Sequence, residues 1–99
     1  MTHVEFGTKV KADLRAAQRA GELARVREAI EDLKAEAPGL DIVALQGRAP
    51  WRRLRSGDLR ILLRPLKPDE MRDLGHRGRG YLVARVVNRR DLDRAVRSL

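Results

Sequence analysis

Five arginines crowd into one short stretch, APWRRLRSGDLRILLR, which runs from Ala49 to Arg64. The planar guanidinium fork of arginine matches the oxygens of a phosphate group and binds them in pairs. Chemistry at a phosphodiester also uses such cations, because attack on phosphorus builds up negative charge in the transition state. The stretch therefore predicts an anion site. The alternative is a solvated basic surface that binds nothing.

The same stretch has the pattern of a β-hairpin, with Ser56-Gly57 as a two-residue connection. In this register Arg53 lies across from Arg60, and Trp51 lies across from Leu62. Facing arginines repel each other by ~0.2–1 kcal/mol, and a bound phosphate would remove that conflict. The alternation of residue types gives one apolar face, Leu54, Leu59, Ile61 and Leu63, and one basic face, Trp51, Arg53, Arg55, Arg60, Leu62 and Arg64.

The net charge of +8 is concentrated in the second half of the chain. Residues 1–47 hold seven basic and eight acidic residues, whereas residues 48–99 hold fifteen basic and six acidic ones. A one-sided basic field indicates a polyanionic partner, either nucleic acid or an acidic protein.

The elements that must carry the hairpin follow from hydrophobic spacing. A short strand is expected at residues 4–6, and apolar residues at helical spacing predict one helix after residue 8 and a second from Leu23 to Ala37, which Pro38-Gly39 ends. After the hairpin we expect a polar loop over residues 67–80, a strand over 81–87 and a short amphipathic tail. This order, β-α-α-β-β-β with a short C-terminal helix, predicts one α+β domain over residues 1–99. Its helix hairpin packs on one face of a small antiparallel sheet.

Several classes of function are not expected. The chain has no cysteine, which suits a reducing cytoplasm, and its two histidines are separated, so we expect no metal site. No secretory signal or apolar membrane-spanning run is visible. The glycine-rich segment at residues 75–80 follows a polar loop rather than a strand, so it is no nucleotide fingerprint, and no cofactor is expected.

Three segments together resemble the RelE/ParE superfamily of bacterial toxins. They are Leu45-x-Gly47, the run Trp51 to Leu62, and Val86-Val87-Asn88-Arg89-Arg90-Asp91. Members of that superfamily typically carry an arginine-rich hairpin of this form and an arginine just after the last strand. The resemblance implies the same fold and an antitoxin as partner. It covers most of the chain, although only the hairpin and the Arg89-Arg90 region are distinctive.

The RelE-like branch implies an endoribonuclease that cuts mRNA on the ribosome without a metal. The 2′-hydroxyl attacks the adjacent phosphate and leaves a cyclic phosphate and a 5′-hydroxyl. By position, Arg60 and Arg89 match the branch's catalytic arginines. Arg53 and Arg55 match its basic strand positions, which contact the RNA backbone or aid proton transfer, and we count Arg53 with the catalytic residues. The residues expected to contact RNA are Arg55, Arg64, Arg85, Arg90 and Trp51.

One departure from the branch keeps two alternatives open. RelE-like enzymes often carry a tyrosine in the C-terminal segment, but here no aromatic residue follows Tyr81. Arginine is a poor general base, so Tyr81 and His76 are the remaining titratable candidates. A ParE-like protein that inhibits DNA gyrase without catalysis fits the missing tyrosine, and a non-toxic binding module is the third alternative.

Overall fold

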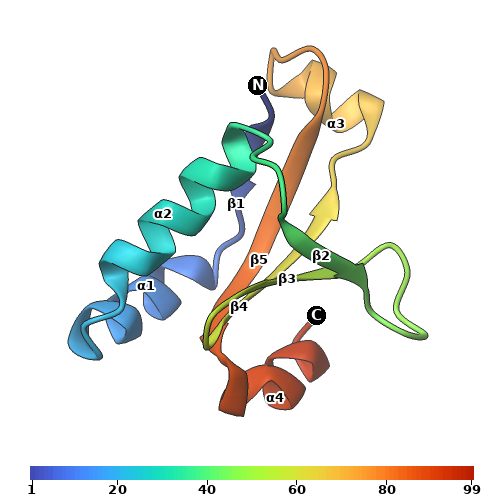
Figure 1. The fold of residues 1–99 in the computed structure, drawn as a ribbon. Coiled ribbons are helices and arrows are strands. Elements are labelled where there is room, and N and C mark those ends of the chain that lie inside the picture. The colour runs from blue at the N-terminus through green and yellow to red at the C-terminus, as the bar shows by residue number, and fades with distance from the viewer.

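A five-stranded sheet forms the centre of the molecule, and helices α1 and α2 cover one of its faces (Figure 1). The computed structural model describes all residues, 1–99. The elements follow in the order β1 (His3–Phe6), α1 (Val10–Arg19), α2 (Leu23–Lys34), β2 (Asp41–Ala44), β3 (Arg52–Ser56), β4 (Leu59–Pro65), α3 (Pro68–Asp73), β5 (Gly80–Asn88), the 3₁₀ turn η1 (Arg89–Asp91) and α4 (Leu92–Arg97).

The strands lie in the order β1-β5-β4-β3-β2. The pairs β2–β3, β3–β4 and β4–β5 are antiparallel, whereas β1 runs parallel to β5. The expected α+β class is confirmed, but the sheet is mixed rather than wholly antiparallel. No tight hairpin joins β1 to β5, so the connection does not dictate their relative direction.

The core lies between α1, α2 and the sheet. The predicted stripe of α2 supplies buried Val26, Ile30 and Leu33, and α1 supplies Val10 and Ala17. The apolar hairpin residues Leu54, Leu59, Ile61 and Leu63 are all at most 1% exposed, as their alternation predicted. The hairpin thus has one face fixed in the core, which leaves Arg53, Arg55, Arg60 and Arg64 on the other face.

The predicted hairpin register is wrong by two residues. Arg55, not Arg53, lies across from Arg60, while Arg53 pairs with Leu62 and Ser56 pairs with Leu59. The turn is therefore Gly57-Asp58, and Gly57 has a φ of +59°. A two-residue type II′ turn needs glycine at its first central position, which Gly57 occupies only in this register. A shift of two residues preserves side-chain direction, so the assignment of faces stands.

Leu62 is fully buried, although it points to the basic face of the hairpin. It lies outside the main core, as does buried Ala95 of α4. The helix α4 packs against β5, which neighbours β4. The basic face is therefore partly covered, and the arginines that stay accessible lie toward the turn and the end of β5.

The segment expected to be a polar loop, residues 67–80, contains the helix α3. Pro68 stands at its first position, and the Glu70 carboxylate accepts a hydrogen bond from the Lys67 backbone N–H at 2.9 Å. These are typical signals of a helix start, but the helix is only six residues long. None of the helices in the structure is long and apolar enough to cross a lipid bilayer.

Candidate nucleic-acid interface

Arg53, Arg55, Arg60 and Arg89 form a cluster near the turn between β3 and β4; we call it the arginine cluster. Arg55 faces Arg60 across the hairpin, and Arg60 pairs with Val87 of β5, so Arg89 follows just beyond the end of the neighbouring strand. The pKa of Arg60 is lowered from its ordinary value by desolvation first, and then by the charges of Arg55, Arg53 and Arg89. The positive charges of Arg53, Arg55 and Arg89 are therefore close enough to act on Arg60.

The hairpin turn holds the Arg60 guanidinium in place. Its Nη1 donates hydrogen bonds to the carbonyl of Gly57 at 2.7 Å and to the carbonyl of Leu59 at 2.9 Å. No carboxylate forms an ion pair with it within 4.0 Å. The remaining N–H donors of the fork are available to a ligand in a fixed direction.

Arg53 carries a buried donor without a partner. Its Nη1 is shielded from solvent and makes no hydrogen bond in the protein. The Asp41 carboxylate on β2 is 3.6 Å away, which is an ion-pair distance but too long for a good hydrogen bond. A buried donor left unsatisfied costs free energy. Because Nη1 is shielded, a ligand anion would have to accept from the exposed part of the Arg53 side chain, which is 19% exposed as a whole.

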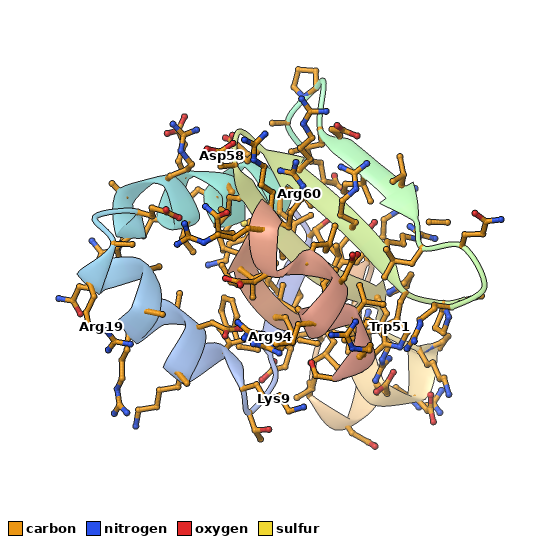
Figure 2. All side chains as sticks on the ribbon, turned by 90° about the horizontal axis from the view of Figure 1, so that it is seen from below. Lys9, Arg19, Trp51, Asp58, Arg60 and Arg94 are labelled. Atoms are coloured by element: carbon orange, nitrogen blue, oxygen red, sulfur yellow. The ribbon has the colours of Figure 1, made fainter.

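Asp58 ties Arg89 to the hairpin turn. The Arg89 backbone N–H donates to the Asp58 carbonyl at 2.7 Å, and the Nε of the Arg89 side chain lies 3.5 Å from the Asp58 carboxylate. Figure 2 labels Asp58 and Arg60 near each other and Trp51 well away from them. The contact of Asp58 with Arg89 was not predicted from the sequence, although the rule for type II′ turns places Asp58 in the turn.

Two predicted RNA contacts are engaged inside the protein. Arg85 forms a two-pronged ion pair with Asp13 of α1, with both nitrogen–oxygen distances at 2.9 Å, and also donates to the Ser98 hydroxyl. Arg64 forms the same kind of pair with Glu70 of α3. These side chains link elements of the fold, so a phosphate would have to compete with a carboxylate for each of them.

Trp51 and Arg90 lie outside the arginine cluster. Trp51 is half-buried in a hollow with Ala84, Ser98 and other residues, and the Arg64 guanidinium sits 5.9 Å from its ring centroid. Arg90 is exposed and forms no side-chain ion pair; it lines a hollow of about 190 Å³ between α1 and the C-terminal segment. Stacking of a base on Trp51 stays a prediction, as does a phosphate contact by Arg90.

The two titratable candidates lie away from the arginine cluster. Tyr81 stands at the start of β5 and its hydroxyl accepts a hydrogen bond from Arg52 at 3.3 Å. Eight residues of extended strand place it roughly 25 Å from Arg89. His76 stacks on His3 of β1, with ring centroids 3.7 Å apart. The only acidic side chains that pair with the cluster are Asp41 and Asp58.

The Arg64–Glu70 pair gives a prediction for acid stability. Hydrogen bonds from Arg64, then from the Lys67 backbone, lower the pKa of Glu70 from 4.5 to about 2. A carboxyl whose pKa is lower in the folded state stabilises the fold above its unfolded pKa and loses that effect as the pH falls. We expect Glu70→Gln to destabilise the protein at pH 7, with the difference from the parent shrinking between pH 4.5 and about 2. Urea unfolding across this range measures it; a difference that stays constant down to pH 2 would contradict the assignment.

Comparisons with known proteins agree with this architecture. The sequence matches no protein-family model and no curated protein. A chain of the RelB-RelE antitoxin-toxin complex from Methanococcus jannaschii is similar in structure, with a TM-score of 0.59 and 18% identity, over 91% of this chain and 95% of that chain. The conserved hypothetical protein HP0892 from Helicobacter pylori gives a TM-score of 0.61 and 20% identity, over 93% and 99% of the two chains. The chain has a RelE-like fold, which confirms the fold expected from the order of the elements and from the resemblance of the three segments.

Proposed function

We propose that the protein is the toxin of a type II toxin–antitoxin system and cuts mRNA on the ribosome in the cytoplasm, without a metal. The observation that carries this proposal is the arginine cluster. In a fold shared with a chain of an antitoxin-toxin complex, it combines an anchored Arg60 fork, a partly exposed Arg53 and an Arg89 whose backbone is tied to the same turn. The phosphodiester backbone of RNA would accept hydrogen bonds from the exposed donors of these arginines.

The proposed reaction is the attack of an RNA 2′-hydroxyl on the adjacent phosphate. The 2′-hydroxyl gives its proton to water as its oxygen bonds to phosphorus, so the pentacoordinate phosphorane carries two negative charges. Its bond to the 5′-oxygen then breaks, which leaves a cyclic phosphate, and the 5′-oxygen takes a proton from water to become a hydroxyl. Arg60 and Arg89 would stabilise the phosphorane, with Arg53 donating to it from the strand. Arg55, exposed and opposite Arg60, would contact a flanking phosphate, as would Arg90. We assign Arg64 and Arg85 to the fold, because both are paired with carboxylates.

One observation favours a second candidate, a ParE-like inhibitor that binds DNA gyrase without catalysis. No histidine or tyrosine lies at the arginine cluster, so the protein offers no ordinary group to move a proton there. A binding function needs no such group. The third alternative, a harmless binding module, requires only the charged surface.

Induction of the protein in a bacterial host, followed by two measurements, separates these functions. The ribonuclease predicts early mRNA cleavage and arrest of translation, before any DNA damage response. A gyrase inhibitor predicts DNA damage and filamentation with mRNA intact. Normal growth at high expression would contradict both toxin functions and leave the binding module.

A cognate antitoxin completes the proposal. The basic second half of the chain would suit an acidic, partly disordered segment that folds when it binds. We expect the neighbouring reading frame to encode such a protein and its coexpression to restore growth. Failure of every neighbouring frame to restore growth would count against a toxin–antitoxin pair.

A further inference from the structure

Arg25 of α2 lies directly against the hairpin turn, although it is far from the hairpin in the sequence. Its Nη1 sits 2.9 Å from the point where a Cβ on Gly57 would stand, and its Cζ sits 3.4 Å from that point. Because Gly57 has no side chain, the guanidinium can rest on the turn. A substituted residue would push the Arg25 side chain away and would also be strained at a φ of +59°.

Gly57 therefore contacts two guanidiniums. Arg60 donates to its carbonyl at 2.7 Å, and Arg25 packs where its side chain would be. Arg25 is exposed, and it forms neither an ion pair nor a side-chain hydrogen bond. Its charge is thus uncompensated by direct contacts, at a turn that already carries Arg60.

We propose that Arg25 is a further phosphate-binding residue, which contacts the RNA backbone next to the phosphate held by Arg60. The inference rests on the proposed ribonuclease function. It adds a residue of α2 to the RNA-binding surface that the hairpin arginines form. Single-stranded RNA fits a second cation at the same turn, because its phosphates recur along the chain and each arginine fork can bind one. An acidic protein segment is the competing occupant, and the experiment below tests for it.

Arg27 is the matched control, because it carries the same charge on the same helix. It is exposed and lines the apolar groove between α1 and α2, together with Leu14 and Val26. Replacing either arginine by alanine changes the net charge equally. Of the two, only Arg25 contacts the turn. A difference in RNA binding between Arg25→Ala and Arg27→Ala would therefore come from the position of the lost charge and not from the net charge.

The experiment measures binding of a fluorescent ten-nucleotide 2′-O-methyl RNA, which cannot be cut because it lacks the attacking hydroxyl. The affinity of the parent, Arg25→Ala, Arg25→Lys and Arg27→Ala is followed from 50 to 300 mM salt. Each phosphate contact with a single strand contributes about 0.7 to the slope of log affinity against log salt. We expect Arg25→Ala to lose about 0.7 of the parent slope and Arg27→Ala and Arg25→Lys to keep it.

Equal slopes for Arg25→Ala and Arg27→Ala would overturn the role of Arg25 in RNA binding. So would a loss of antitoxin affinity in Arg25→Ala with the RNA slope unchanged, which would assign the side chain to the protein partner. The proposed function itself is checked on the parent by ribosome-dependent cleavage. A parent that cleaves while Arg25→Ala keeps its slope refutes this inference alone, whereas a parent that neither binds nor cleaves RNA refutes both.

Discussion

Replacing Arg60 by alanine should lower RNA cleavage about 10²–10³-fold, which is the usual cost of losing one positioned donor at a developing anion. The fold should be unharmed. The Arg60 side chain lies on the basic face and faces Arg55, so its removal relieves one repulsion. Its two hydrogen bonds reach carbonyls at the hairpin turn, where water can replace it. Cleavage rates and melting temperatures of the purified parent and Arg60→Ala test the expected loss of activity and the expected unchanged stability.

The control is Arg52→Ala, because Arg52 belongs to the same hairpin but its side chain lies on the opposite face of the sheet from Arg60. Arg52 donates to the Tyr81 hydroxyl on the core side of the sheet, so this variant should cut RNA at nearly the parent rate. If Arg60→Ala cleaves as fast as the parent, Arg60 is not at the centre of the site. If it loses activity only because it unfolds, the arginine is structural and the anion site is wrong.

Asp13→Ala should cause the largest loss of stability, about 3–5 kcal/mol, as expected when one member of a buried ion pair is removed. Asp13 is 8% exposed and accepts three hydrogen bonds, two from the Arg85 side chain and one from the Val86 backbone N–H. Hydrogen bonding between the Arg85 side chain and Asp13 is the largest cause that raises the pKa of Arg85. The substitution leaves a half-buried guanidinium without its carboxylate and a buried N–H without an acceptor.

Thermal unfolding measures this effect, at about 4–8 °C per kcal/mol for a chain of this size. Asp93→Ala, which removes an exposed carboxylate from α4, is the control and should unfold close to the parent temperature. The double variant Asp13→Leu/Arg85→Met should recover much of the loss, because apolar residues of similar volume need no partner. A single-variant loss below about 1 kcal/mol would show that the pair does not hold α1 to β5.

The faces of the hairpin were predictable because alternation of apolar and basic residues allows only one way to bury it. The register predicted with Ser56-Gly57 as the turn was wrong, although the sequence held the information: a type II′ turn needs glycine at its first central position, which selects Gly57-Asp58. The short helix α3 was missed because six residues give too little periodicity to read.

Contacts between segments that are distant in the chain could not be predicted from the sequence. Arg85 looked like any other basic residue of the second half, yet its partner Asp13 lies on α1, far earlier in the chain. Arg25 likewise reads as an exposed helix position, and only the packing of α2 beside the turn brings it to Gly57. Local patterns carry no record of which helix surface meets which turn, so both roles required the structure.

The most direct test of the central claim uses the purified protein, ribosomes programmed with a defined mRNA, and EDTA. Ribosome-bound mRNA should be cut, with a 2′,3′-cyclic phosphate on one product and a 5′-hydroxyl on the other. The cleavage rate should fall when Arg60 or Arg89 is replaced by alanine and should not depend on added metal. Intact mRNA on the ribosome, together with inhibition of purified DNA gyrase by the same preparation, would contradict the account.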